Sequence, residues 1–178
     1  MMLAASIEWP ADVKATEGRI QEVLYRELSK RGHEPIIPNI EMLSGEADLV
    51  SITKAGFVNE FEIKISRSDF KADRKKQAKH MRYADVLTGD STGVFQHAHR
   101  LSAPTQFWYA VPAGLVNEGE VPPHAGLMYV GMNDGFWRLR TVRRAPRLHS
   151  ERVPEHDMRA IARSFMFRYW SQRLKDVA

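Results

Sequence analysis

The sequence contains no cysteine among its 178 residues. Disulfide bonds and thiolate metal sites are therefore excluded, and any metal ion must be held by oxygen or imidazole ligands, which favour magnesium, manganese or calcium. No apolar run approaches the roughly 20 residues of a membrane-spanning helix. The first ten residues have no basic segment ahead of their apolar residues, so they form a poor secretory signal. We therefore expect a cytoplasmic protein that does not enter a membrane.

The composition is that of a folded globular protein rather than a disordered one. Hydrophobic residues make up 43% of the chain and charged residues 27%, and the sequence shows no internal repeat or low-complexity tract. The length predicts one domain spanning residues 1–178. The formal net charge of +4 favours a polyanionic partner over a cationic one, although charge of this size is a weak signal by itself.

The first half of the chain alternates between helix and strand patterns. A helix begins at Thr16 and ends before Gly32, with an apolar stripe formed by Ile20, Val23, Leu24 and Leu28. Residues 34–42 form a strand-like run whose two prolines predict either an edge strand or an irregular entry into the sheet. Residues 48–53 and 57–65 are the clearest strands, and the glycine-containing turn between them predicts a hairpin.

The second half predicts one more basic helix, three further strands and a terminal helix. The basic helix covers about residues 69–86, capped by either Ser66 or Ser68. Strands follow at 106–111, 125–131 and 136–142. A helix over about 154–175 then carries several aromatic residues, which we expect to pack on the core, with an oligomer contact as the alternative: Phe165, Phe167, Tyr169 and Trp170. The pattern predicts an α/β (α+β) domain with a central mixed sheet flanked by helices.

Two acids and a lysine fall on the predicted hairpin. Asp48 begins the first strand, and Glu62 and Lys64 lie two residues apart near the end of the second. Because strand side chains alternate between faces, Glu62 and Lys64 share one face while Ile63 faces the other way. If the strands pair, all three charged residues converge, which is what a divalent cation and a phosphate group require. The competing interpretation is that these charged residues simply lie on the solvent-exposed face of an antiparallel sheet.

The motif formed by Asp48, thirteen intervening residues and Glu62-Ile63-Lys64 resembles the PD-(D/E)XK nuclease superfamily. The longer string over residues 61–70, followed by Asp73, Lys79-His80 and Tyr83, is similar to the MmcB-like DNA-repair and phage nucleases. Residues 107–114 and 124–128 also match the later strands of that group. The resemblance covers about residues 16–142, and the expected C-terminal helix lies outside it. The superfamily's proline before the first acid is absent, since Ala47 stands there.

The resemblance implies a restriction-endonuclease-like core of αβββαβ order and a Mg²⁺- or Mn²⁺-dependent deoxyribonuclease. Asp48 and Glu62 are the expected metal ligands, and the resemblance adds the main-chain carbonyl of Ile63. A bound magnesium ion supplies a Lewis acid and an activated water. Lys64 would orient that water or stabilise the transition state. Glu17, on the first helix and expected on its core-facing stripe, is the preferred further acid, ahead of Glu60 and Glu27.

DNA is the expected partner, and the basic helix after Lys64 supplies candidate phosphate contacts. They are Ser66, Ser68, Lys75, Lys76, Lys79 and His80. For a single lysine a solvated helix face is the simpler interpretation, and one of the serines is expected to cap the helix. The arginines from 138 to 152 form a second basic patch or protect an edge strand.

Two further functions remain open. One is a catalytically weak or inactive DNA-binding module on the same fold, and the other is a protein that uses the sheet face only structurally. The presence of Asp48, Glu62 and Lys64 together favours the nuclease, because a binding module could dispense with Lys64. A homodimer would suit a nuclease that cuts both strands.

Overall fold

The computed structural model describes residues 7–42, 45–75, 77–88 and 104–175. Its elements follow the predicted order, and a short 3₁₀ helix at Glu118–Glu120 is added between two strands. The helices and strands are α1 (Glu17–Lys30), β1 (Ile36–Met42), β2 (Gly45–Ile52), β3 (Val58–Ile63), α2 (Arg67–Asp73), α3 (Gln77–Thr88), β4 (Gln106–Pro112), β5 (Ala125–Asn133), β6 (Phe136–Arg143) and α4 (Glu155–Lys175).

The six strands form one mixed sheet in sequence order, from β1 at one edge to β6 at the other. Strands β1, β2 and β3 pair antiparallel, β3, β4 and β5 pair parallel, and β6 returns antiparallel to β5. The edge position of β1 agrees with the prolines of that strand. The predicted α+β class, with a central mixed sheet and a C-terminal helix, is confirmed.

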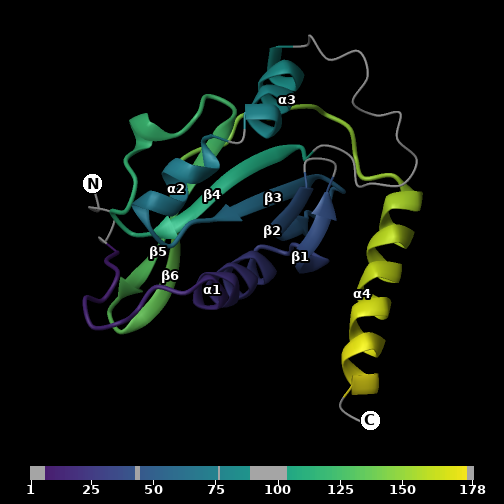
Figure 1. Ribbon diagram of the computed structural model, residues 1–178, viewed down its shortest axis with the longest axis horizontal. Coiled ribbons are helices and arrows are strands. Elements are labelled where there is room, and N and C mark those ends of the chain that lie inside the picture. Colours follow the sequence, from purple (N-terminus) through teal and green to yellow (C-terminus); the bar gives the residue numbers. More distant parts are fainter. Residues whose placement is uncertain (1–6, 43–44, 76, 89–103, 176–178) are drawn as a thin grey trace.

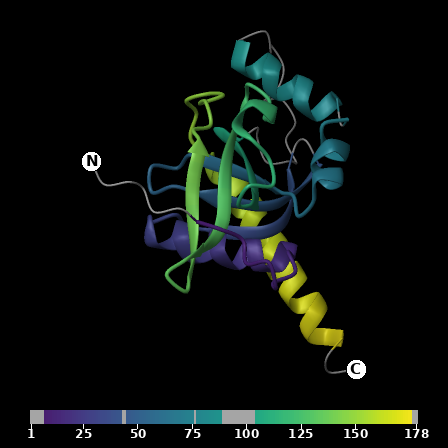
Figure 2. The ribbon, with the colours of Figure 1, turned by 90° about the vertical axis from the view of Figure 1, so that its left-hand side faces the viewer.

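Helices cover both faces of the sheet (Figures 1 and 2). The stripe of α1 packs on one face against residues such as Phe61, Ile63 and Trp108. On the other face, Phe70 of α2 and Tyr83 of α3 pack with aromatic residues of β4. Alternation along β3 therefore sends Ile63 toward α1 and its charged neighbours toward α2 and α3.

The predicted helix over residues 69–86 is divided into α2 and α3. The division falls after Asp73, where Arg74 and Lys75 are exposed. Exposed side chains add no packing against the sheet, and most of the stability of a helix in a protein comes from a packed face. The break thus follows from the same basic run that suggested a phosphate-binding helix.

The expectation that the C-terminal helix packs on the core is wrong for most of its length. Ile161 joins the core cluster beside β1 and β2, but Phe167 is 72% and Trp170 53% exposed. The apolar residues of α4 are spread around the whole helix rather than along one stripe, so they cannot all face the sheet. Figures 1 and 2 show α4 running out past the end of the sheet. Among the described residues, no helix is both long and apolar enough to cross a membrane.

Candidate functional site

Asp48 and Glu62 lie opposite each other at one end of the β2–β3 pair. The strands pair Val50 with Glu60 and Leu49 with Phe61, so the next step of the register sets Asp48 against Glu62. The main-chain N–H of Ile63 donates to Asp48 Oδ2 at 2.6 Å. The structure therefore brings together the two acids that the sequence pattern singled out.

Lys64 completes this group from the same face of the chain. Its Nζ donates to Glu62 Oε1 at 2.7 Å, and both side chains are almost fully buried. Asp69 and Asp73 of α2 lie 3.9 Å from the same ammonium group. Burial acts to lower the pKa of Lys64, but the carboxylates of Glu62, Asp73 and Asp69 raise it above its ordinary value. Lys64 is thus held as a cation at the end of β3.

The position of Asp48 disfavours the charged form of its carboxyl group. Burial, followed by the neighbouring Glu62, raises the pKa of Asp48 to about 6, and the more distant Glu17 adds to the rise. The Ile63 N–H and Lys64 offset only part of this effect. A cation placed beside Asp48 would lower this raised pKa, because an opposite charge favours the ionised carboxylate.

The donor atoms of this site fit a hard cation. Asp48, Glu62 and the Ile63 carbonyl offer only oxygen, and magnesium commonly takes one or two carboxylates plus waters and substrate phosphates. In the described part of the chain, no three His, Asp or Glu side chains lie close enough to hold a metal between them. The described side chains therefore do not form a complete metal cage by themselves.

Glu17 lies near Asp48, but the prediction that it lies on the core-facing stripe of α1 is wrong. It is exposed in the first turn of α1, beside the N-cap residue Thr16. Gln21 Nε2 donates to Glu17 Oε1 at 3.1 Å and to the main-chain oxygen of Asp48 at 2.9 Å. The amide of Gln21 thus links the start of α1 to the Asp48 strand, a contact that sequence analysis missed.

The two fallback acids have other partners. Glu60 is fully buried, accepts a hydrogen bond from Tyr83 at 2.6 Å and pairs with Lys79 at 2.9 Å. Glu27 pairs with Lys30 on the surface of α1. These partners give no indication that either carboxylate acts beside Asp48.

Lys79 is the main residue whose position sequence analysis missed. It was interpreted as part of a solvated, phosphate-binding helix face, but it is 7% exposed and lies between β3 carboxylates. Its Nζ lies 2.6 Å from Glu62 Oε2 and 2.9 Å from Glu60 Oε1. Lys79, Tyr83 and Val86 follow the i, i+4, i+7 spacing of an inward helix stripe, and this spacing was the signal available in the sequence.

His80 also points inward rather than to a nucleic acid surface. Its Nδ1 lies 3.1 Å from Nε2 of the buried His124, and its Nε2 lies 3.4 Å from Asp73 Oδ2. Tyr109 donates to the same Asp73 carboxylate at 2.6 Å. Burial acts to raise the pKa of Asp73, but hydrogen bonds from His80 and Tyr109 and the charge of Lys64 hold it well below its usual range.

The other predicted phosphate contacts divide into two kinds. Ser66 caps α2 by accepting from the N–H of Asp69 at 3.1 Å, and Ser68 Oγ lies 2.9 Å from Ser66 Oγ. Lys75 is exposed. Lys76 lies outside the described residues. Of the predicted set, Ser68 and Lys75 are therefore the exposed members among the described residues.

The buried His124 predicts a specific pH dependence of stability. Burial first, then the charges of His80, Arg143 and Lys79, lower its pKa from 6.5 to about 4. Its contribution to stability is therefore present above pH 6.5 and is lost as the pH falls through 4. We expect the free energy of unfolding to drop by about 2 kcal/mol across this window.

Urea unfolding at pH 7 and pH 4 measures this drop in the wild type and in His124→Asn. The variant should lose less stability than the wild type over the same interval. His156→Asn is the matched control, because the side chain of His156 is 70% exposed. An equal drop in His124→Asn and the wild type would contradict the assignment.

Comparison with known proteins supports the fold but does not identify a family. No protein-family model and no curated protein matches the sequence. A protein of unknown function from Silicibacter pomeroyi aligns over 92% of this chain and 94% of its own, with a TM-score of 0.56 and 19% identity. The two chains share a fold.

A repair endonuclease from Pyrococcus abyssi aligns over 62% of this chain and 42% of its own, with a TM-score of 0.35 and 16% identity. Similarity of this size does not establish a common fold, so the functional argument depends on the site itself.

Proposed function

We propose that the protein is a metal-dependent nuclease that hydrolyses phosphodiester bonds in DNA. The observation that carries this proposal is the convergence of Asp48, Glu62 and Lys64 at one end of β2 and β3. This arrangement matches the resemblance to PD-(D/E)XK nucleases of the MmcB-like type. A homodimer remains a prediction.

In this proposal Mg²⁺ or Mn²⁺ would be held by Asp48, Glu62 and the main-chain carbonyl of Ile63. When bound, the ion supplies Lewis-acid stabilisation of the phosphate and a more acidic water. Lys64 places a fixed positive charge beside the phosphoryl oxygens, where charge develops in the transition state. For Glu62 to bind metal, one of its carboxylate oxygens must leave its lysine partner, Lys64 or Lys79.

A DNA-binding module without catalysis is the second candidate, and one observation favours it. Both oxygens of Glu62 already pair with lysines at 2.7 and 2.6 Å, so a metal ion must compete with two ammonium groups. This candidate predicts DNA binding that depends on salt but no strand cleavage.

Incubation of the purified protein with linear, circular, single-stranded and branched DNA in Mg²⁺ or Mn²⁺ separates the two candidates. The nuclease requires metal-dependent products from at least one substrate. Intact DNA in every reaction, combined with salt-sensitive binding, would favour the binding module and reject the nuclease.

Replacement of Asp48 by asparagine tests the metal site without measuring activity. Asp48 has a folded-state pKa of about 6 against an ordinary 3.8, so its contribution to stability is full below pH 3.8 and is lost as the pH rises through 6. Asparagine keeps an acceptor for the Ile63 N–H but carries no charge. In metal-free buffer at pH 7.5, Asp48→Asn should therefore be more stable than the wild type by about 2 kcal/mol.

Thermal unfolding with and without Mg²⁺ completes this test. The ion should raise the melting temperature of the wild type and leave that of Asp48→Asn unchanged, because only the charged site binds it. An equal increase in both proteins would place the ion elsewhere.

A further inference from the structure

Helix α4 carries more than half of the exposed large apolar side chains in the described part of the chain. Six of the eleven belong to this helix: Phe165, Met166, Phe167, Tyr169, Trp170 and Leu174. The other five are distributed over α1, α3, β6 and the segment after β3. Figures 1 and 2 show the C-terminal part of α4 extending beyond the sheet. A contiguous apolar surface of this kind marks an interaction site.

Part of this surface lies on the side of α4 that faces away from the sheet. Ile161 packs in the core cluster beside β1 and β2. Trp170 follows it by nine residues, which is about two and a half turns, so it lies on the opposite side of the helix. Phe167 and Leu174 flank Trp170 at spacings of three and four residues, the spacing of the apolar seam between paired helices. Together with Met166, one turn before Trp170, these side chains form the outer stripe of α4.

The outer stripe is large enough to form the apolar part of a stable dimer interface. Its four side chains are 53–72% exposed. Aromatic side chains bury about 150–250 Å² each when fully covered, and with the somewhat smaller aliphatic ones the stripe presents roughly 500 Å². A standard interface covers about 800 Å² of each partner, and homodimer interfaces are about 65% apolar. The stripe therefore provides the apolar area that one side of a homodimer needs.

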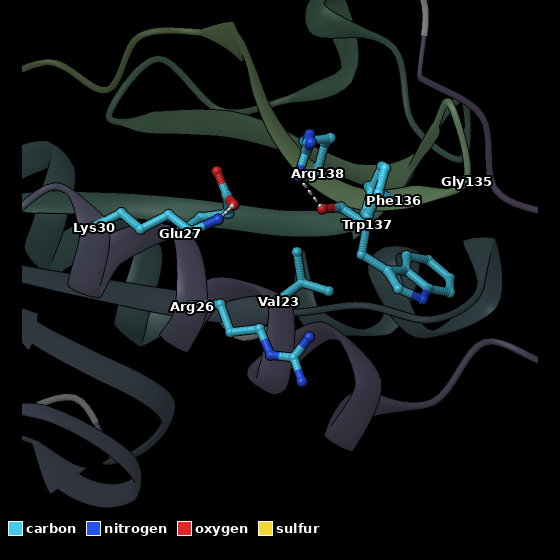
Figure 3. Close-up of a pocket in the computed structure, with 8 residues that line it drawn as sticks. All are labelled: Val23, Arg26, Glu27, Lys30, Gly135, Phe136, Trp137 and Arg138. Carbon is cyan, nitrogen blue, oxygen red and sulfur yellow. Dashed lines mark hydrogen bonds and ion pairs between the residues drawn. The ribbon is translucent and has the colours of Figure 1, made fainter.

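The hollow between α1 and β6 has a different character (Figure 3). Helix α1 lines it mainly with charged residues, Arg26, Glu27 and Lys30, and Lys30 donates to Glu27 at 2.7 Å. Phe136, at the turn of the hairpin in Figure 3, is a single exposed ring whose centre lies 5.2 Å from the Arg138 guanidinium. Single exposed apolar side chains are normal on protein surfaces, so this region does not have the apolar area of the outer stripe.

The charges of α4 are arranged so that the helix complements a second copy of itself. An exposed acid, Glu155, begins the helix and an exposed cation, Lys175, ends it. Parallel pairing of two copies would set Arg163 beside Arg163 and Lys175 beside Lys175. Antiparallel pairing sets Glu155 of each copy beside Lys175 of the other, and such flanking charges select the orientation of paired helices. The pair that Glu155 makes with Arg159 in its own helix is exposed on both sides, so it competes only weakly.

We propose that two copies of this chain form a symmetric homodimer through the outer stripes of their α4 helices, which pair antiparallel. Full overlap of two helices of 21 residues places the two-fold axis at Phe165. Trp170 then faces Ala160 of the second copy, so a large side chain meets a small one. Phe167 faces Arg163 of the second copy, a pairing that cation–π attraction favours. Each contact occurs twice, as the two-fold symmetry requires.

Sedimentation equilibrium over a range of protein concentrations tests the dimer. Interfaces of standard size have dissociation constants from micromolar to picomolar, so the wild type should have twice the mass of one chain at concentrations well above this range. Phe167→Glu combined with Trp170→Glu should raise the dissociation constant at least about 100-fold, because central aromatic residues dominate interface energies. Both side chains are exposed in the single chain, so the variant should keep the circular dichroism spectrum of the wild type.

Single introduced cysteines report the orientation of the helices, because the chain has no cysteine of its own. Met166→Cys lies one residue from the proposed axis, so a short thiol-reactive cross-linker should join two copies. Glu155→Cys should not be joined, because antiparallel pairing separates the two copies of this position by about 30 Å. Cross-linking of Glu155→Cys, or none of Met166→Cys, would overturn the antiparallel pairing.

Phe136→Glu is the matched control for the charged variant, because Phe136 is another aromatic residue that is 62% exposed but lies outside α4. It should remain dimeric. Asp48→Asn should dimerise like the wild type, so the dimer stands or fails separately from the proposed nuclease activity. The inference is overturned if the wild type sediments as a single chain at every concentration, or if Phe167→Glu with Trp170→Glu dimerises as tightly as the wild type.

Discussion

Replacing Lys64 by methionine is expected to slow DNA cleavage by about 10³-fold, because the transition state loses a fixed cation where negative charge develops. The Lys64 ammonium is almost fully buried and is held by Glu62 at 2.7 Å, with Asp69 and Asp73 at 3.9 Å. Methionine has a similar length but no charge. Glu62 would still pair with Lys79, so the variant should fold.

Single-turnover cleavage rates at saturating protein measure this effect on the chemical step. The DNA dissociation constant of Lys64→Met should stay within about threefold of the wild type, since the exposed side chains proposed to contact DNA are unchanged. Lys54→Met, at an exposed position in the turn between β2 and β3, is the matched control and should cleave at the wild-type rate. A Lys64→Met variant that cleaves normally would remove this lysine from the mechanism.

Replacing Lys79 by methionine is expected to lower the free energy of unfolding by about 3–5 kcal/mol, the usual cost of breaking a buried ion pair from one side. Lys79 joins α3 to two carboxylates of β3, Glu60 and Glu62, at 2.9 and 2.6 Å. Burial acts to lower the pKa of Lys79, but these two carboxylates raise it above its ordinary value. Without the ammonium group, Glu60 would keep only Tyr83 as a partner among the contacts described above.

Urea unfolding of three proteins separates the charge effect from lost packing. Lys79→Met should be strongly destabilised, and adding Glu60→Gln should recover part of the loss by removing the buried charge left behind. Lys75→Met should stay within about 0.5 kcal/mol of the wild type, as expected for an exposed side chain. If Lys79→Met unfolds at the wild-type urea concentration, then Lys79 is not the structural link between α3 and the sheet.

The parts of the site that depend on strand alternation could be predicted from the sequence. Glu62 and Lys64 share a face because they are two residues apart, and the short turn before Phe57 fixes which residue of the preceding strand meets them. The edge position of β1 followed from its prolines. These features are local, so the sequence pattern contains most of the information that determines them.

The residues that sequence analysis misplaced depend on contacts between distant elements. A lysine in a basic segment usually points to solvent, and only the arrival of Glu60 and Glu62 beneath α3 makes burial of Lys79 favourable. In α4, aromatic residues lie on every side of the helix. The helix was therefore expected to pack on the core, although it has no single apolar stripe that faces the sheet.

The most direct test of the account is cleavage of one labelled branched DNA, containing a single-stranded arm, by wild-type protein and Asp48→Asn in parallel. Each protein is assayed in Mg²⁺ and Mn²⁺ and again with a chelator. We predict metal-dependent products with the wild type and none with Asp48→Asn, although both bind the DNA. Intact DNA under every condition, or equal cleavage by the two proteins, would contradict the assignment of Asp48, Glu62 and Lys64 as a nuclease site.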